Sequence, residues 1–557
     1  MKNVKTIGLA CFLGLGLASC SDFLNILPPN DIVLENYWTG KADVESAVIG
    51  CYTALEKPDC ITRMALWGEM RSDNIIQGMS TPESESQTLK GNILPSSSLT
   101  SWTCFYQVIN RCNTVLYYAP QVQALDPNYT ESQLKATIAE VTAIRDLCYF
   151  YLIRTFRDVP FVTKPSIDDN QVYRIPASSF DSVLTCLVED LELVKDDAVN
   201  RYAVEDQNSG RITRTSIHAL LADMYLWKQD YSNSIKYCDL VIDSKKKLYE
   251  EEKNRTESKI KLFSTYPLIT EQISGSYVGN AYTEIFGMGH SFESIFELSF
   301  VENQSVKNSF VTKYYGSSTD VGFLSASEFL FKDVLTNLNT LFKKTDCRYL
   351  ETMEDVGGMY AIDKYCRLAV TFNNTVENPV GAASRRSTEY ANWIIYRLTD
   401  IMLMKAECEV ARAGNFKPDS LNSEQLQGYH TAFSLISAVY NRANNFTPTT
   451  RDTLVFANYA LTRTAMEGLV LKERQRELLF EGKRWFDLVR LARRDGNNSR
   501  LINYSIIKYS DNKNAIRLKM ASPNTLYFPY NENELKVNEY LHQNPAYNTE
   551  TTSSITE

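Results

Sequence analysis

Apolar residues recur at intervals of three and four along several long stretches of the chain, which is the spacing of one face of an α-helix. From Trp102 to Leu116 the apolar positions follow this period through Phe105 and Ile109. The same spacing over 138–151 and 180–194 predicts two further amphipathic helices. The first part of the chain is therefore expected to be mainly helical.

The segment 215–244 indicates how these helices are arranged. One helical stripe runs up to a short polar turn at 228–230, and a second stripe follows it. The large and small positions match the spacing of a tetratricopeptide helix pair, at Leu221, Ala222, Tyr225, Ser234 and Cys238. Small side chains at Ala222 and Ser234 would let the two helices approach closely. A second, looser pair is predicted at 396–412 and 424–444, and such pairs stack in groups of three or more.

The pattern changes between residues 245 and 390. Tyr, Gly, Ser and Asn crowd this part, and the stretch 293–300 alternates apolar and polar residues as a strand does. We predict a mostly α fold, in which a tetratricopeptide-like helical-repeat scaffold carries a loop-rich insertion with short strands. The predicted parts are a signal peptide (1–19), an N-terminal helical part (20–244), a variable ligand-binding region (245–390), and a C-terminal helical part with a loop-rich tail (391–557).

The N-terminus has the pattern of an exported lipoprotein. Lys2 and Lys5 precede an apolar run that is shorter than the roughly twenty residues a membrane-spanning helix needs. The residues 17–20, Leu-Ala-Ser-Cys, have the spacing of a bacterial lipobox, in which Cys20 would be acylated and become the first residue after cleavage. An ordinary signal peptide with an incidental cysteine is the alternative. Multiple acyl chains would anchor the protein to a membrane without spanning it.

The charge and the cysteine content further narrow the class of protein. Removing residues 1–19 takes away Lys2 and Lys5 and no acid, so the formal charge changes from -9 to -11. A chain this acidic is not expected to bind nucleic acid, whose phosphates need a basic face. Ten cysteines follow Cys20, too few for a disulfide scaffold, and we expect most of them to be small core residues. The sequence leaves open whether Cys51 and Cys60 form a disulfide.

No catalytic constellation is visible. The chain has four histidines, with no pair at metal-ligand spacing, and it lacks the common nucleotide, zinc-protease and serine-hydrolase motifs. We therefore predict no catalytic residue, no metal and no cofactor. The charged stretch 471–491 reads as one helix with internal ion pairs between Glu473 and Arg476, Arg474 and Glu477, Glu481 and Arg484, and Lys483 and Asp487. We expect that helix to be structural, with Trp485 on its buried side.

Seven blocks of sequence resemble the SusD/RagB family, in the family's order and over nearly the whole chain. They are CSDFLNILPPN after the lipobox, WTCFYQVINRCN, EVTAIRDLCYFYLIRTFRDVPFV, ESIFELSF, YRLTDIMLMKAECEVARAG, LKERQRELLFEGKRWFDLVRL and LYFPYNENELKVNEYLHQNPAY. The resemblance implies a lipoprotein on the outer membrane, facing the cell exterior, that captures oligosaccharides and passes them to a SusC-like TonB-dependent transporter. It implies no enzyme activity.

Two other functions remain open from the residues alone. The first is a tetratricopeptide-type protein-interaction scaffold at the outer membrane that binds no small ligand. The second is a glycoside hydrolase, whose two carboxylates would have to meet in a cleft.

Candidate ligand-binding residues lie in two regions. A sugar offers an apolar ring face and a rim of hydroxyls, so aromatic rings together with charged or amide groups suit it. The first region holds Trp67, Arg71, Asp73 and Asn74, at a position similar to one that often lines the family's site. The second region, within the loop-rich insertion, holds Tyr277, Tyr282, Tyr314 and Tyr315.

Overall fold

The computed structural model describes most of the chain between residues 37 and 548. Inside that range it leaves out 168–170, 255–258, 274–275, 278–279, 303–304, 317–320, 331–340, 344, 373–380, 387–388, 415–421, 445–451 and 461. Cys20 and the predicted signal peptide lie outside the described residues. No helix among the described residues is long and apolar enough to cross a membrane.

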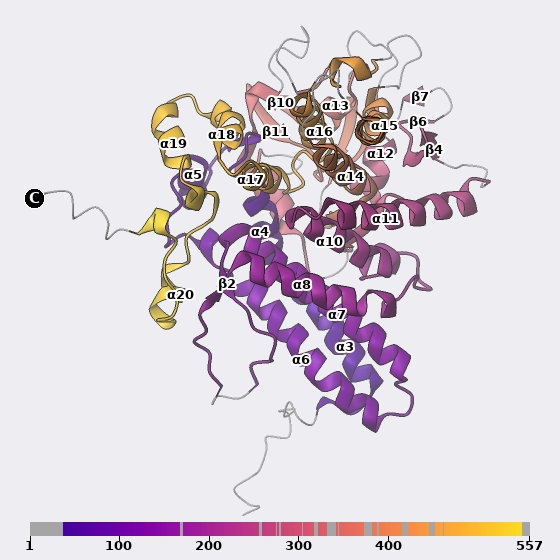
Figure 1. The fold of residues 1–557 in the computed structure, drawn as a ribbon, viewed down its shortest axis with the longest axis vertical. Coiled ribbons are helices and arrows are strands. Elements are labelled where there is room, and N and C mark those ends of the chain that lie inside the picture. Colours follow the sequence, from indigo (N-terminus) through magenta and orange to yellow (C-terminus); the bar gives the residue numbers. More distant parts are fainter. Residues whose placement is uncertain are drawn as a thin grey trace, which may run out of the picture.

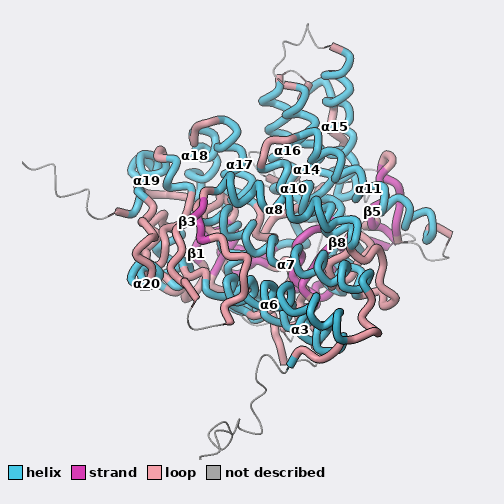
Figure 2. Tube along the Cα trace, turned by 60° about the horizontal axis from the view of Figure 1, so that its bottom comes forward, coloured by secondary structure: helices cyan, strands magenta, loops and turns pink. Residues whose placement is uncertain are grey.

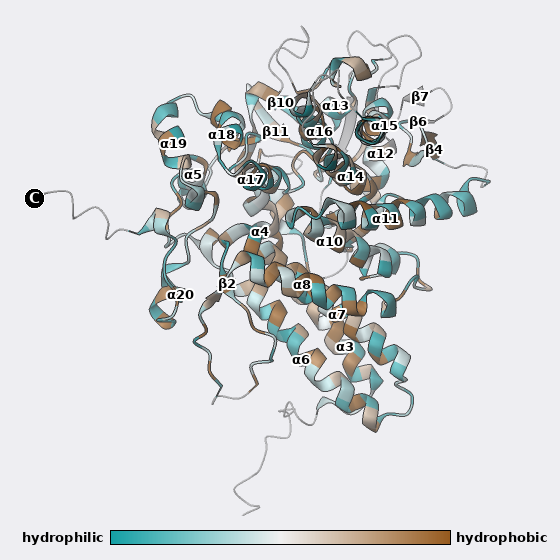
Figure 3. Ribbon diagram, viewed as in Figure 1, coloured by the Kyte–Doolittle hydropathy of each residue, from teal (hydrophilic) through white to brown (hydrophobic). Residues whose placement is uncertain are grey.

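Eight helices pack one on the next through the body of the molecule, running from the bottom to the top of Figure 1. They are α3 (Lys41–Leu55), α6 (Thr103–Leu125), α7 (Glu131–Phe156), α8 (Phe180–Val194), α10 (Arg214–Trp227), α11 (Tyr231–Glu252), α14 (Leu398–Ala413) and α15 (Ser423–Asn444). Each buries an apolar side against its neighbours, while the outer part of α11 is hydrophilic (Figure 3). The predicted helical-repeat scaffold is confirmed.

The pair α10 and α11 has the close contact that the small residues predicted. The Ser234 hydroxyl donates to the Ala222 carbonyl oxygen across the helix interface, at 2.8 Å. The Cys408 thiol of α14 donates in turn to the Ser234 hydroxyl oxygen, at 3.1 Å. Asp230 caps α11 by accepting from the Asn233 backbone N–H. Because Ser234 has a short side chain, α10, α11 and α14 can pack closely around it.

Short strands are concentrated between α11 and α14, and the described strands pair two by two (Figure 2). The predicted strand at 293–300 is β8 (Ser294–Leu298), and it pairs antiparallel with β14 (Trp393–Arg397). All five of its residues are buried rather than alternating, because α10 also covers this strand. The other strands of this part are β4 (Ile260–Phe263), β5 (Tyr266–Ile269), β6 (Gln272–Ile273), β7 (Ser276–Tyr277), β9 (Leu324–Ala326), β10 (Met353–Val356), β11 (Met359–Ile362), β12 (Arg367–Phe372) and β13 (Gly381–Arg385).

Shorter elements complete the described fold. Two small strands, β2 (Val159–Pro160) and β3 (Ala177–Ser178), pair with each other, while β1 (Ile75–Gln77) pairs with β9 of the loop-rich part. On the left of Figure 1, α5 lies beside the C-terminal helices. The short helices are α4 (Pro58–Glu69), α5 (Glu83–Leu89), α9 (Gln207–Gly210), α12 (Asn280–Tyr282), α13 (Arg348–Thr352), α18 (Ser499–Ser505), α19 (Lys513–Met520) and α20 (Glu532–Val537).

The prediction of one continuous helix over 471–491 is wrong. Helix α16 (Arg463–Glu477) ends in a turn, and α17 (Arg484–Asp495) begins after it. Phe480 and Gly482 in that turn have φ of 64° and 70°, which no helix accommodates. The Glu473–Arg476 ion pair is present as predicted, since both residues stay on α16. Trp485 is buried, as expected.

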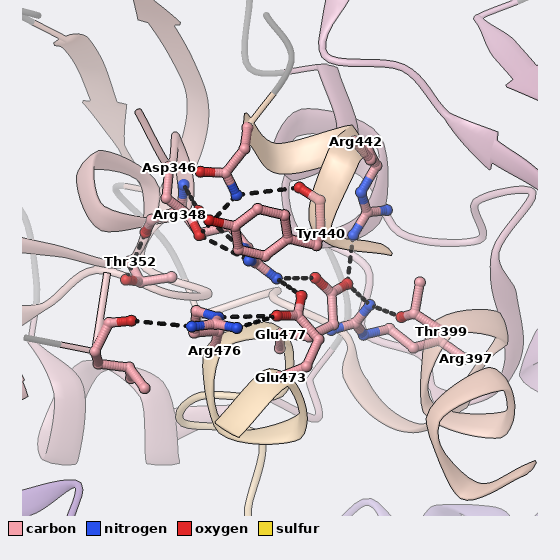
Figure 4. Close-up of polar contacts among 12 residues, drawn as sticks. Asp346, Arg348, Thr352, Arg397, Thr399, Tyr440, Arg442, Glu473, Arg476 and Glu477 are labelled. Carbon is pink, nitrogen blue, oxygen red and sulfur yellow. Dashed lines mark hydrogen bonds and ion pairs between the residues drawn. The ribbon is translucent and has the colours of Figure 1, made fainter. Parts of the chain in front are cut away.

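Among the described residues, pairs with other segments replace the remaining three predicted ion pairs. Arg474 binds Asp400 and Asp487, Glu481 binds Lys364 and Arg397, and Lys483 binds Asp400. Arg397 and Arg442 meet at Glu477, and Arg348 also reaches it (Figure 4). This buried network ties α14, α15, α16 and the loop-rich part together.

The ten cysteines from Cys51 onward carry no disulfide in the described structure. Nine are buried and Cys186 is partly exposed, which confirms the prediction that they pack as small core residues. Cys51 and Cys60 lie on different helices, and their nearest thiol partners are Cys112 and Cys104.

Candidate functional site

The first predicted binding region is buried where the N-terminal helices meet α16 and α17. Trp67 lies within α4 with 1% of its surface exposed, stacked on Phe105 with ring centroids 5.1 Å apart. Its indole N–H donates to the Leu99 carbonyl oxygen at 2.8 Å. Because both the ring and the polar edge are occupied, Trp67 is a core residue and presents no face to a ligand.

Arg71 is also held inside the protein. Its guanidinium lies 4.1 Å from the centre of the Trp485 ring and donates to the backbone carbonyl oxygens of Thr525 and Leu526. Burial lowers the pKa of Arg71, and the surrounding tyrosines oppose this shift. The residue therefore fastens the C-terminal segment to the end of α4.

Asp73 and Asn74 belong to a buried polar cluster. The Arg484 guanidinium donates to both Asp73 carboxylate oxygens at 2.8 and 2.9 Å, and the Gln475 amide donates to Asp73 and Asn74 at 3.0 and 2.7 Å. Asn74 donates to Glu69 at 2.5 Å. Burial raises the pKa of Glu69 to about 7, against the opposing effect of that hydrogen bond. The cluster joins α4 to α16 and α17.

The tyrosines of the second region have internal partners as well. The Tyr282 hydroxyl donates to the Asp363 carbonyl oxygen at 2.9 Å, and the Tyr315 hydroxyl donates to the Phe480 carbonyl oxygen at 2.8 Å. The Tyr314 hydroxyl donates to the Glu85 carboxylate at 2.8 Å. All three are buried. Tyr277 is on β7, and its side chain lies outside the described residues.

Seven of the eight predicted residues thus lie in the interior, contrary to the expectation that they stand apart from the packed faces. The physical reason is that aromatic and charge-pairing groups also satisfy a large polar core, which the sequence did not distinguish from a ligand site. Both regions nevertheless lie next to the same pocket. Ile75–Gln77 continue directly from Asn74, and Glu85, which Tyr314 holds, belongs to the helix beside them.

This hollow, which we call the β1 pocket, has a volume of about 410 Å³. It lies between β1, the end of α5 and the segment that leads into α19. Its lining residues are Ile75, Ile76, Gln77, Leu89, Lys90, Lys508, Tyr509, Ser510, Asp511, Asn512 and Ile516. The β1–β9 pairing forms one wall of the pocket. Just after β1 the two chain segments are so close that a Cβ on Gly78 would lie 2.4 Å from the Gly322 carbonyl oxygen.

The pocket combines an apolar wall with a polar rim. Ile76, Leu89 and the half-buried ring of Tyr509 supply apolar surface, and Ser510, Asp511 and Asn512 are exposed at the rim. Lys508 donates to the carbonyl oxygens of Met70 and Ile75 at 2.7 and 3.3 Å. Burial lowers the pKa of Lys508 to about 7, against the attraction of Asp73.

The lining of the pocket is aromatic, apolar, polar and charged in turn. Asp511 is the single carboxylate among the described lining residues, and no histidine or cysteine is among them. Hydrolysis of a glycosidic bond usually needs two carboxylates. An aromatic ring beside amide, hydroxyl and charged groups suits a ligand with apolar faces and many hydroxyls.

Sequence analysis missed the segment 508–512. The local signal was a tyrosine within a run of polar residues after an apolar stripe, which is common in surface turns. What marks it as part of a pocket is its position across from β1, more than 430 residues earlier in the chain.

A second hollow, of about 520 Å³, lies between α6, the chain at 160–175 and α20. Trp102, Tyr106 and Val537 give it a more apolar lining than the β1 pocket has, and Tyr173 is exposed at its edge. We call it the α6 groove.

The fold and the pockets define a helical-repeat binding protein with a loop-rich insertion. A model of the SusD family matches residues 359–547. The SusD-like protein P38 of Formosa agariphila is 23% identical over 507 residues, which cover 88% of this chain and 92% of that protein. The chain is thus similar to the SusD/RagB family, in its C-terminal part by the family model and over most of its length by the relatives.

Solved structures have the same fold. A SusD superfamily protein from Bacteroides thetaiotaomicron aligns with a TM-score of 0.65 at 18% identity, covering 91% of this chain and all of that one. The surface glycan-binding protein A of Bacteroides thetaiotaomicron aligns with a TM-score of 0.62 at 18% identity, again over 91% of this chain and all of that one.

Proposed function

We propose that this protein is a cell-surface, outer-membrane lipoprotein that binds oligosaccharides and passes them to a SusC-like TonB-dependent transporter. Similarity to the SusD family supports the glycan ligand and the surface location, and one structural neighbour is itself named as a glycan-binding protein. The observation that carries the proposal is the β1 pocket, in which the Tyr509 ring stands beside hydroxyl, amide and carboxylate groups. The protein binds its ligand and does not cleave it.

The pocket dimensions agree with a sugar ligand. A volume of about 410 Å³ is in the range of small-molecule sites. One or two sugar rings would place an apolar face on Tyr509, while Gln77 and Asn512 lie at positions from which they could bind hydroxyls. The buried Asp73–Arg484 pair behind the pocket holds the start of β1 in place.

The test begins with a glycan array probed with protein that lacks residues 1–20, followed by calorimetry on the glycans that bind. Tyr509→Ala and Asn512→Ala should each weaken binding at least about tenfold, or about 1.4 kcal/mol, with an unchanged melting temperature. Tyr117→Ala removes an exposed tyrosine on α6, outside the lining of the pocket, and serves as the control. Unchanged affinity in both pocket variants would place the glycan elsewhere.

A protein-interaction scaffold is the second candidate, and the α6 groove is the observation that favours it. Its apolar lining suits a partner protein better than a sugar. Tyr173→Ala and Val537→Asp would weaken such a complex and leave glycan binding intact. If no glycan binds and these variants release a co-purifying protein, the scaffold function replaces the glycan function.

Membrane attachment through acylated Cys20 is part of the proposal. Cys20→Ala should abolish incorporation of a labelled palmitate analogue and release the protein from the membrane fraction. Cys11→Ser, which changes the other cysteine of the N-terminal segment, should leave both unchanged. Continued labelling of Cys20→Ala would exclude this anchor.

The transporter partnership needs its own test. Solubilised outer membranes should yield a complex of the wild-type protein with a TonB-dependent transporter, and the complex should persist when Tyr509→Ala removes glycan binding. Recovery of the protein without any transporter would leave glycan capture in place but contradict direct transfer.

A further inference from the structure

Three side chains with metal-ligand chemistry meet inside the loop-rich part of the protein. One ligand atom each from Glu271, Cys347 and Glu351 lies within 4.8 Å of the other two. The residues are 5%, 1% and 4% exposed, so bulk water does not separate them. Sequence analysis predicted no metal site because it relied on histidine spacing, and these residues come from segments about 80 positions apart.

The local backbone fixes this arrangement. Cys347 precedes the first turn of α13 and Glu351 follows four residues later, which places both side chains on one face of the helix. The Cys347 backbone N–H donates to the Ala443 carbonyl oxygen at 3.1 Å, which fastens the start of α13 to α15. Glu271 follows β5, and its carboxylate accepts from the Ala281 backbone N–H at 3.4 Å.

The neighbouring arginines form their ion pairs with other acids. Arg348 donates to Asp346, Glu473 and Glu477, and Arg442 donates to Glu477 (Figure 4). Arg442 also donates to Glu293. Among the described residues, neither Glu271 nor Glu351 forms an ion pair. The buried Oε1 of Glu351 also has no hydrogen-bond partner. Unpaired buried anions are costly, so this cluster must be neutralised by protons or by a metal ion.

Protonation is the simpler alternative. Burial raises the pKa of Glu351 to about 7, opposed by the nearby Arg442, and burial also raises the pKa values of Glu271 and the Cys347 thiol. In that state the cluster is neutral, and the metal measurements below distinguish it from a metal-bound cluster. A metal ion would in addition account for the convergence of three ligand atoms of the kinds that zinc binds.

We propose that Glu271, Cys347 and Glu351 form a buried structural site for one Zn²⁺ ion. A thiolate and two carboxylates are ligand types that zinc binds, at about 2.0–2.3 Å. Ligand atoms around one tetrahedral ion lie about 3.3–3.8 Å apart, so separations of at most 4.8 Å would have to close by no more than about 1.5 Å. The thiol proton, and any proton on the carboxyl groups, would be released to solvent on binding.

Such an ion would link α13 to the segment that follows β5, within the loop-rich part of the protein. The site does not depend on the glycan function, since it shares no residue with the β1 pocket.

The test uses the mature protein purified without chelators. We expect about one equivalent of zinc per chain by elemental analysis, and a rise in melting temperature of about 2 °C or more when Zn²⁺ is added to chelator-treated protein. Co²⁺ in place of Zn²⁺ should give a thiolate-to-cobalt charge-transfer band.

Two variants separate the metal site from its alternatives. Cys347→Ser should abolish the charge-transfer band, and Glu351→Gln, which has the shape of the protonated acid, should lower zinc affinity at least about tenfold while the protein stays folded. Cys186→Ser removes a partly exposed thiol and should change neither result. Less than a tenth of an equivalent of zinc with no thermal shift, or unchanged zinc affinity in Glu351→Gln, would overturn the proposal.

Discussion

The guanidinium of Arg484 holds both carboxylate oxygens of Asp73, at 2.8 and 2.9 Å, although the two residues are 411 positions apart in the chain. This pair joins the N-terminal part of the fold to its C-terminal part, since Asp73 lies two residues before β1 and Arg484 begins α17. It also explains why a residue expected to contact a ligand is buried instead.

Removing Asp73 should cost mainly stability. Asp73→Ala leaves the Arg484 charge buried without its partner, so we expect a loss of about 3–5 kcal/mol in the free energy of unfolding. Asp511→Ala, at the exposed rim of the β1 pocket, should change it by less than about 0.5 kcal/mol. Denaturant titrations measure both. A stable Asp73→Ala protein that no longer binds glycan would mean that Asp73 contacts the ligand directly.

Trp67 is expected to behave as a core residue. Trp67→Ala should lower the free energy of unfolding by about 3–5 kcal/mol, because it removes a buried ring stacked on Phe105. Trp67→Phe keeps an aromatic ring and loses the hydrogen bond to Leu99, so its cost should be smaller. If Trp67→Ala retained full stability and lost glycan affinity, the interpretation of Trp67 as a ligand contact would be restored.

Replacement of two helical glycines by alanine should change the stability of the protein in opposite directions. A Cβ on Gly68 would lie 1.7 Å from the Gly482 carbonyl oxygen, so Gly68→Ala must push α4 away from the turn before α17 and should cost at least about 3 kcal/mol. Gly468 on α16 has no atom within 4 Å of that position, and Gly468→Ala should stabilise the protein by up to about 1 kcal/mol. Similar melting temperatures for the two variants would contradict this contact.

Asp487 should contribute a pH-dependent part of the stability. Burial alone would raise its pKa, but Arg474 and Arg490 outweigh burial and lower the pKa from 3.8 to about 2. The unfolded chain therefore binds the proton first, so this stabilisation is complete above about pH 5 and is lost as the pH falls toward 2. The stability difference between wild type and Asp487→Asn should shrink by about 2 kcal/mol over that range. A constant difference would contradict the lowered pKa.

The sequence by itself determined the local helices and the resemblance to the SusD/RagB family. The helical period predicted α8 over Phe180–Val194, and the small residues Ala222 and Ser234 predicted the closest contact between α10 and α11. These features depend on residues a few positions apart, whose side chains share a helix face whatever the rest of the chain does. The family blocks could be recognised for the same reason, because each is a short continuous segment.

Only the tertiary structure decided which partners the charged and aromatic residues have. The turn at Phe480 and Gly482 separates α16 from α17, so Asp487 of α17 can bind Arg474 of α16, and Tyr315 is anchored to the Phe480 carbonyl oxygen. The β1 pocket and the cluster of Glu271, Cys347 and Glu351 are likewise assembled from segments far apart in the chain. A buried ion pair and an exposed binding group use the same residue types, and burial depends on how distant segments pack, which local periodicity does not encode.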